Sequence, residues 1–206
     1  MSPRPYKLGQ RQAANEQTRL RILNAARDLL LANDGFAAFS LDAVARRADV
    51  ARMTVYHQFS SKSGLLEALS DSLAVNGGME HLATVFSQPD PLAVLNQYIQ
   101  VFSRFWDADR LVIRRLRALA VLDPEFELVI RARDERRRQG VRVITHRLIE
   151  KRLFAPIESL DETVDSLFTL LSFETFDTLA GPTRSLEEVA PLVCRLVHAA
   201  LNLNTK

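Results

Sequence analysis

The fold is decided by residues 40–66, whose sequence is SLDAVARRADVARMTVYHQFSSKSGLL. Ser40 stands where a helix N-cap is expected, and Asp42 follows in the first turn, where a carboxylate meets the positive end of the helix dipole. Asp49 ends the apolar pattern of the helix that begins after Ser40. Asp tolerates the left-handed backbone of a tight turn better than most residues. A second short helix follows at once. The stretch therefore predicts two short helices joined by a tight turn.

The flanking residues complete a three-helix unit. Apolar residues recur at spacings of three and four between about residues 16 and 33, which predicts an amphipathic first helix. The second short helix is expected over about residues 52–58, and Ser60 or Ser61 can cap a further helix over 62–76. Three helices in this order form a helix-turn-helix, which is how a protein places a short helix in the DNA major groove.

Helical signals also fill the rest of the chain. Gly77 and Gly78 break the helix before them. Asp-Pro pairs at 90–91 and 123–124 predict two helix starts, and capping boxes at 159–162 and 185–188 predict two more. Because the sequence shows no alternating strand pattern, we expect an all-α fold of about nine helices. It consists of an N-terminal three-helix helix-turn-helix domain and a larger helical ligand-binding and dimerisation domain.

These signals divide the chain into four predicted parts. They are a flexible basic N-terminal arm (1–14), a helix-turn-helix DNA-binding domain (15–61), a connecting helix (62–76), and an effector-binding and dimerisation domain (77–206). The arm carries three basic residues among Pro, Gly and Gln. It would either reach into a minor groove or be only a disordered tail. The basic residues are Arg4, Lys7 and Arg11.

The charge of the chain is unevenly distributed. The 206 residues have a net charge of only +2. Residues 1–62 hold 10 Lys and Arg against 5 Asp and Glu, and residues 63–206 hold 17 against 20. The positive excess therefore coincides with the predicted helix-turn-helix, where a polyanion would need it.

Several classes of protein are not favoured by the composition. Cys194 is the only cysteine, so no disulfide can form within one chain, and we expect it to be a small buried hydrophobe. There is no apolar run of signal-peptide or membrane-span length, which favours a cytoplasmic protein without a membrane partner. Phosphate loops, dinucleotide turns, catalytic elbows and clustered metal ligands are missing from the sequence, and the four His are scattered. We therefore expect neither an enzyme nor a cofactor or metal site.

A set of short pieces between residues 18 and 66 forms a recognisable pattern. The pieces are Thr18-Arg19, Ile22-Leu23, Ala25-Ala26, Gly35-Phe36, Ser40, Val44-Ala45, the run TVYHQF at 54–59, Ser61-Lys62 and Leu65-Leu66. Together they resemble the DNA-binding domain of the TetR family of transcriptional regulators. The chain departs from the family pattern at Asp49, where Gly is usual, and at Arg52 and Met53, where Lys and a small residue are common. The C-terminal two-thirds resemble the family only in length and helical character.

Three residues of the stretch are predicted to hold DNA by its phosphates. Tyr56 and Lys62 can donate hydrogen bonds to phosphate oxygens and so set the register of the protein on the duplex. Ser40, at a helix N-terminus, offers its hydroxyl and unpaired backbone N–H groups to another phosphate. These contacts would be independent of base sequence.

The second short helix is predicted to contact the bases. Arg52 can form a bidentate pair with guanine, and Met53 or Thr54 can touch a thymine methyl group. The resemblance implies the same division, with a groove-facing side that carries Arg52, Met53, Thr54, Tyr56 and His57. Taken without its context, the same helix could be an ordinary solvated surface.

A dimer surface is expected on the last two helices. One recognition helix buries too little surface for tight specific binding, whereas a two-fold dimer can bind a palindrome. The resemblance also implies that the last two helices pair with those of a second copy. The alternative is that both apolar faces are buried within one chain. The predicted interface residues are Leu167, Leu170, Leu171, Leu192, Val193, Leu196, Val197 and Ala200.

An effector site is expected among the middle helices, where aromatic residues and nearby polar groups could surround a small molecule. Each of these aromatic residues could equally be ordinary core. Arg110, Arg114 and Arg117 share one helical face, which suits an acidic ligand but equally a solvated or salt-bridged face. The candidates are Phe102, Phe105, Trp106, Arg114, Arg117, Phe126, His146, Phe168, Phe173, Glu174 and Phe176.

These features together predict a sequence-specific DNA-binding transcriptional regulator. We expect a homodimer, most simply a repressor, that binds a palindromic operator in double-stranded DNA and is released by an unknown small-molecule effector. The competing readings are an enzyme and a helical protein-interaction module. Salt dependence separates them, because a DNA-binding protein loses affinity steeply as the salt concentration rises.

Overall fold

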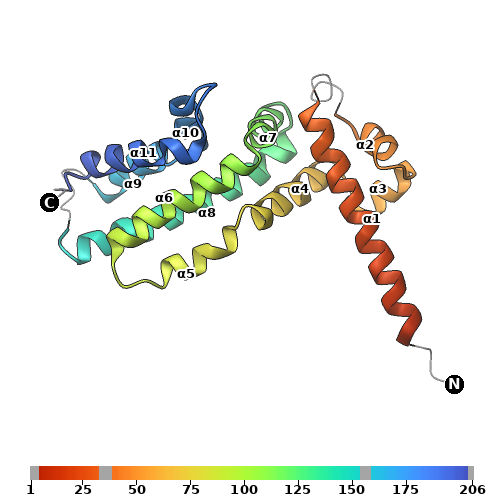
Figure 1. Cartoon of the computed structure of the whole chain (residues 1–206), viewed down its shortest axis with the longest axis horizontal. Coiled ribbons are helices and arrows are strands. Elements are labelled where there is room, and N and C mark those ends of the chain that lie inside the picture. The colour runs from red at the N-terminus through yellow and green to blue at the C-terminus, as the bar shows by residue number, and fades with distance from the viewer. Residues whose placement is uncertain (1–4, 33–38, 154–158, 204–206) are drawn as a thin grey trace. The chain divides into compact units, whose positions relative to one another are not determined.

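The fold is all-α in the described part of the chain, as predicted (Figure 1). The computed structural model describes residues 5–32, 39–153 and 159–203. Within these ranges there are eleven α-helices and one short 3-10 helix, rather than about nine helices. Arg4, Gly35 and Phe36, which the sequence singled out, lie outside the described residues, as does the side chain of Lys7.

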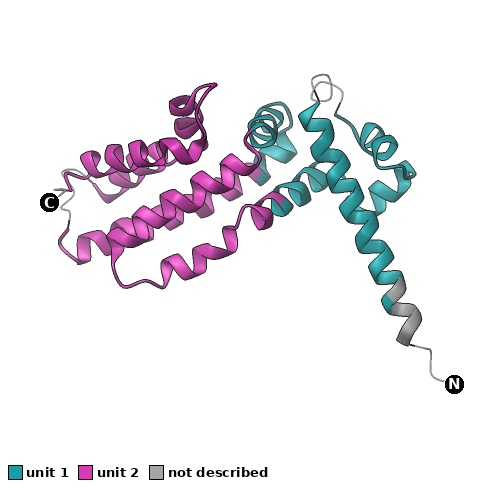
Figure 2. Cartoon of the chain, in the orientation of Figure 1, with its two compact units in different colours: residues 1–72, 111–129 teal, residues 73–110, 130–206 magenta. Residues whose placement is uncertain are grey.

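The helices belong to two compact units, and neither unit is contiguous in sequence (Figure 2). Unit 1 comprises residues 1–72 and 111–129, and unit 2 comprises residues 73–110 and 130–206. Unit 1 contains α1 (Pro5–Leu31), α2 (Leu41–Arg47), α3 (Arg52–Phe59) and most of α4 (Lys62–Asn76). It also contains most of α7 (Arg110–Leu122) and the first turns of α8 (Pro124–Glu150).

Unit 2 is built mainly from the later helices. It contains η1 (Met79–His81), α5 (Leu82–Phe86), α6 (Pro91–Ala108) and the remainder of α8. The last three helices are α9 (Leu160–Leu170), α10 (Phe173–Ala180) and α11 (Leu186–Ala200).

The helix boundaries around the turn follow from local chemistry. The Ser40 side chain accepts a hydrogen bond from the Ala43 N–H and caps α2, as predicted. Asp49 has a φ of 51°, so it does occupy the left-handed conformation of the turn. Ser61 caps α4, because its Oγ accepts the Gly64 N–H at 2.9 Å. Local capping by a serine side chain therefore accounts for the starts of α2 and α4.

Three helices differ from the predictions. The helix α1 begins at Pro5 instead of near Glu16, so the described part of the predicted arm is helical. Pro is tolerated at the first helical position, because that N–H has no helical partner in any case. The helix α5 has five residues, which is too short to show a periodic pattern. The last predicted helix but one is two helices, since Ser172 caps a separate α10.

The core of unit 1 joins α1, α2, α3 and α4. Ile22 and Leu30 from α1, Val44 from α2, Val55 from α3 and Leu65 from α4 are all fully buried. The helix α7 adds a polar tie to this core, because Arg115 donates hydrogen bonds to the Leu30 and Ala32 carbonyls at the end of α1. Carbonyls at a helix C-terminus need partners from outside the helix, and the guanidinium supplies hydrogen bonds to these two.

The core of unit 2 centres on α6 and α11, which pack together in antiparallel directions. The Leu186 N–H at the start of α11 donates to Asp107 Oδ1 near the end of α6, at 2.7 Å. Near the other end of the pair, His198 Nε2 lies 3.1 Å from Asn96 Oδ1. Tyr98 on α6 is also buried, and its hydroxyl donates to the Arg137 carbonyl of α8.

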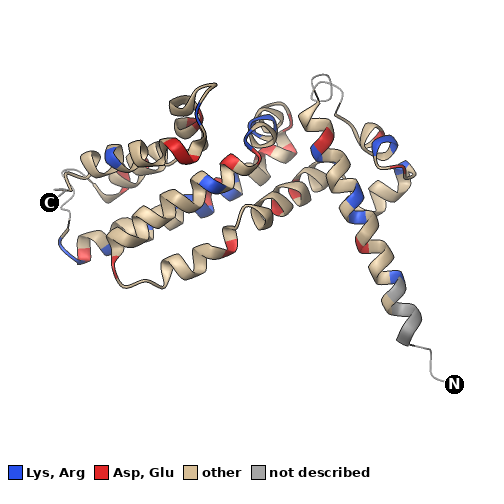
Figure 3. Ribbon diagram, viewed as in Figure 1, with Lys and Arg blue, Asp and Glu red and all other residues tan. Residues whose placement is uncertain are grey.

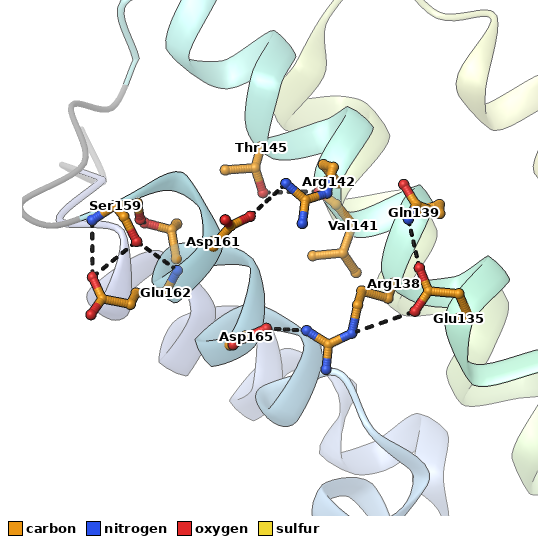
Figure 4. Close-up of polar contacts among 11 residues, drawn as sticks. Glu135, Arg138, Gln139, Val141, Arg142, Thr145, Ser159, Asp161, Glu162 and Asp165 are labelled. Carbon is orange, nitrogen blue, oxygen red and sulfur yellow. Dashed lines mark hydrogen bonds and ion pairs between the residues drawn. The ribbon is translucent and has the colours of Figure 1, made fainter. Parts of the chain in front are cut away.

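The helices α8 and α9 are joined by charged side chains (Figure 4). Arg138 pairs with Asp165, and Arg142 Nη1 lies 2.7 Å from Asp161 Oδ1. Figure 4 also shows the Ser159–Glu162 capping box that starts α9, as predicted. The pairs are largely exposed, so we expect them to set the register of α9 on α8 more than to stabilise the unit.

Candidate nucleic-acid interface

The helix α3 has one exposed and one buried face. The side chain of Arg52 is 67% exposed, and Met53 and Tyr56 are 57% and 52% exposed. On the opposite face Val55 is fully buried and Phe59 is 6% exposed. A short helix that buries only this face has its polar and long side chains available to a partner.

The other predicted DNA contacts lie around this face. His57 is exposed and Thr54 is half-buried on α3. Ser40 is half-buried at the start of α2, where its Oγ is 3.2 Å from the Ala43 N–H. Lys62 begins α4, with 36% of its side chain exposed. All seven predicted contact residues therefore belong to unit 1, and none is fully buried.

The helix α1 holds α3 in place through side-chain contacts that the sequence did not predict. The Arg19 guanidinium lies 4.5 Å above the Phe59 ring, and its Nη1 donates to the Gln58 carbonyl at 3.3 Å. Gln58 Nε2 in turn donates to Asn15 Oδ1. Arg19 was part of the sequence pattern, but only the fold shows that it orients the end of α3 instead of facing outward.

Two basic residues beside the turn of unit 1 lie close to carboxylates. Arg52 Nε is 3.4 Å from Asp42 Oδ1, which ties the first residue of α3 to the first turn of α2. Arg47 at the end of α2 pairs with Asp28 of α1, also at 3.4 Å. In Figure 3 basic residues recur along α1 and α2 with acidic residues interspersed. Arg47 and Arg52 are thus held in ion pairs at the end of α2 and at the start of α3.

The junction of α3 and α4 is too tight for a side chain at Gly64. A Cβ on Gly64 would lie 2.2 Å from the Phe59 carbonyl oxygen, so only glycine fits without a backbone shift. Ser60 in the same junction has a φ of 64°. This close approach sets the distance between the exposed face of α3 and Lys62 at the start of α4.

Residues 22–69 match the family model for bacterial regulatory proteins of the TetR family. In sequence, this similarity to the TetR family is confined to the N-terminal part of the chain. The match covers α2, α3 and parts of α1 and α4, and so includes every predicted DNA contact.

The chain is similar to known regulators in its N-terminal part. It is 40% identical over 63 residues to the HTH-type transcriptional regulator AlkX of Mycobacterium tuberculosis, which is 31% of this chain and 29% of AlkX. The chain therefore aligns with less than a third of that relative.

Two solved structures share the fold of this chain over most of its length. The TetR family regulator PfmR from Thermus thermophilus matches with a TM-score of 0.66 at 23% identity, over 90% of this chain and 100% of PfmR. A putative transcriptional regulator from Saccharomonospora viridis, solved in complex with choline, matches with a TM-score of 0.67 at 16% identity. That match covers 89% of this chain and 96% of the other.

The candidate effector residues of this chain fall into separate groups. An aromatic cluster in unit 2 joins five of them through ring contacts such as Trp106 to Phe176, whose centroids are 5.4 Å apart. Phe168 instead contacts the guanidinium groups of Arg137 and Arg138, which lie 3.9 and 4.3 Å from the centroid of its ring. The five clustered residues are Phe102, Phe105, Trp106, Phe173 and Phe176.

The remaining effector candidates lie outside this cluster. His146 and Glu174 are exposed, and the His146 ring is 3.6 Å from Glu150. Arg114, Arg117 and Phe126 belong to unit 1, where Phe126 is fully buried. The sequence grouped these residues by type and spacing, and neither property shows which unit a side chain joins.

A groove of about 530 Å³ lies between α6 and α11, and none of the predicted effector residues lines it. Its wall includes Cys194, whose thiol lies 3.1 Å from Asn96 Oδ1. Cys194 is half-buried, and its burial raises the pKa of the thiol. A raised pKa disfavours the reactive thiolate form, consistent with a structural role.

The predicted dimer residues occupy two faces of α9 and α11. Leu167, Leu171, Val193 and Val197 are buried within the chain. The other four leave apolar surface exposed: Leu196 is 37% exposed, Ala200 is exposed, and Leu170 and Leu192 are half-buried. Only this second face is available to another copy of the chain.

Two further features bear on the kind of protein. No helix in the described ranges is long and apolar enough to cross a membrane. Within the same ranges, no three His, Cys, Asp or Glu side chains are grouped so that they could hold a metal ion.

Proposed function

We propose that this chain is a sequence-specific DNA-binding transcriptional regulator. It binds a palindromic operator as a homodimer, acts as a repressor, and is released by a small-molecule effector. The observation that carries the proposal is the exposed face of α3, with Arg52, Met53, Tyr56 and His57 on a helix whose other face is buried. The family match over the same residues supports it.

The proposed contacts divide into two kinds. Tyr56, Lys62 and Ser40 bind phosphates and position the protein, whereas Arg52, Met53 and Thr54 contact base edges in the major groove. The Arg52–Asp42 ion pair helps this task, because it limits the conformations of a long side chain before DNA arrives. His57 lies on the exposed face and can contact either bases or phosphates.

The dimer and the effector are assigned to unit 2. Leu192, Leu196 and Ala200 are spaced by four residues along α11, so they form one apolar stripe that suits pairing with a second copy. The regulator from Saccharomonospora viridis binds choline within the same fold. We propose that this chain also takes a small molecule in unit 2, at the aromatic cluster around Trp106.

The proposal is tested by selecting bound sites from random duplexes and measuring affinity by fluorescence anisotropy. The selected sites should be palindromic, and affinity should fall steeply with salt, since each neutralised phosphate adds about 0.9 to the slope of log affinity against log salt. Lys62→Ala should weaken binding to all duplexes and reduce that slope. The matched control is Lys151→Ala, which removes an exposed lysine of unit 2 and should leave binding unchanged.

Two outcomes would contradict the proposal. One is selection that yields no enriched sequence, with a salt slope near zero, which would favour an enzyme or a protein-interaction module. The other is equal losses for Lys62→Ala and Lys151→Ala, which would mean that only the overall positive charge matters.

A further inference from the structure

The predicted phosphate-binding lysine already has an anionic partner. Lys62 Nζ lies 3.4 Å from Asp123 Oδ2, and both residues belong to unit 1. The two side chains are 36% and 21% exposed, so the pair is partly shielded from water. A phosphate oxygen that binds Lys62 must either share the ammonium group with this carboxylate or displace it.

The Asp123 carboxylate is held in a defined position. Its Oδ1 accepts the Phe126 N–H at 3.2 Å and so caps α8, whose first residue is Pro124. Phe126 is fully buried, which anchors this first turn in the core of unit 1. Because one carboxylate oxygen is used by the cap, the other is presented to Lys62 without a large loss of side-chain entropy.

A second acidic residue of the same turn reaches the start of α4. Ser61 directly precedes Lys62 in the sequence, and its Oγ lies 3.4 Å from Glu125 Oε1. The first turn of α8 is acidic at Glu125 and Glu127 as well as at its cap. Two carboxylates of this turn therefore contact two successive residues at the N-terminus of α4, the end of a helix that attracts anions.

We propose that Asp123, assisted by Glu125, competes with the DNA phosphate for Lys62 and so limits the affinity of the protein for DNA. The inference rests on the proposed DNA-binding function. In the free protein the Lys62–Asp123 pair is formed, and binding of a phosphate must break or weaken it. A competing carboxylate lowers affinity for every duplex equally, since a phosphate contact carries no base information.

The size of the effect follows from the exposure of the pair. Partly exposed ion pairs contribute up to about 1 kcal/mol, which corresponds to about a five-fold change in affinity. Removal of the competing charge also frees Lys62 to neutralise a phosphate fully. The slope of log affinity against log salt concentration should then become steeper, by at most about 0.9 for each phosphate that a Lys62 side chain neutralises.

The test compares Asp123→Asn with the wild type on the duplex selected above and on a random duplex pool. Asn is a good helix N-cap, so the start of α8 is retained. We expect a two- to five-fold gain in affinity on both probes, roughly as an exposed ion pair allows. The matched control is Asp90→Asn, which changes the same Asp-Pro cap at the start of α6 and should give no gain.

A double-mutant cycle with Lys62→Ala separates direct competition from a general charge effect. In the Lys62→Ala background, the gain from Asp123→Asn should shrink, because no ion pair remains to be broken. An undiminished gain in that background would overturn the inference, as would unchanged or weaker binding by Asp123→Asn itself. If the wild type binds no duplex at all, it is the proposed function that fails, and the two failures are therefore distinguishable.

Discussion

Single residues set the chemistry of the proposed interface, and Arg52 is the one most directly placed for base contact. It is the first residue of α3, its side chain is 67% exposed, and Asp42 holds its Nε at 3.4 Å. The terminal nitrogens of the guanidinium group can therefore extend to the two acceptors of a guanine edge. The same position is where the chain departs from the family pattern, so Arg52 is expected to distinguish its operator from those of relatives.

Replacing Arg52 by Ala should relax base preference at one position of each half-site. The expected loss is about 1–3 kcal/mol on the preferred sequence, with little change on unrelated duplexes. Repeating the site selection with the variant measures it, with Arg46→Ala as the control, an exposed arginine near the end of α2. An identical selected sequence for Arg52→Ala would remove this residue from the base-contacting set.

Whole helices depend on their first turns, and α11 shows this most clearly. Ser185 Oγ accepts the Glu188 N–H at 3.0 Å, and Glu188 Oε2 accepts the Ser185 N–H at 2.6 Å. Both halves of the capping box are therefore formed. This helix carries the apolar stripe proposed for dimerisation, so the cap bears on assembly as well as on the stability of unit 2.

Ser185→Ala should lower the free energy of unfolding by about 1 kcal/mol, as expected for loss of an N-cap hydroxyl. Urea unfolding followed by circular dichroism measures this. Ser166→Ala is the matched control, because Ser166 is exposed within α9 and alanine favours helix there. Equal effects of the two substitutions would contradict a stabilising role for the cap.

The contribution of this capping box to the free energy of unfolding should depend on pH. Hydrogen bonds from Ser185 lower the pKa of the Glu188 carboxyl group below its ordinary value. A lowered folded-state pKa means that this contribution is fully present above the ordinary carboxyl pKa and is lost as the pH falls through the folded-state value. The difference in unfolding free energy between the wild type and Glu188→Gln, which removes the titrating carboxyl group, should therefore narrow in acid. A difference that stays constant down to that pH range would contradict the prediction.

At the scale of the whole molecule, the proposed function requires two copies of α3 on one duplex. The exposed stripe on α11 is the surface that would join them, and Leu196 lies in its middle. A charged residue at this position would be buried in both copies of a symmetric interface. The free-energy cost of burying the charge would therefore apply to each protomer.

Sedimentation velocity should show a dimer for the wild type and dissociation for Leu196→Glu, accompanied by loss of operator affinity. Leu128→Glu is the matched control, since Leu128 is 68% exposed in unit 1. It should leave the dimer intact. A monomeric wild type would refute the proposed interface, and a dimeric Leu196→Glu variant would place the interface elsewhere.

The compact units of this chain cannot be predicted from local sequence alone. Gly77 and Gly78 predict a boundary between the connecting helix and the effector part, and the four-part division stays a prediction. In the structure, residues 111–129 join the N-terminal unit, where Arg115 binds carbonyls at the end of α1. Such a long-range arrangement leaves no signal in local composition.

The sequence by itself determined the helices and the turn, because caps and periodicity act within a few residues. Ser40, Asp49 and the Ser185–Glu188 box behave as their local chemistry requires. Only the tertiary structure decided which charges meet, since Lys62 and Asp123 are far apart in the chain and nothing near either residue predicts the other. It likewise decided which leucines of α11 are buried. An ion pair between distant helices depends on how the helices pack, and packing is a property of the whole fold.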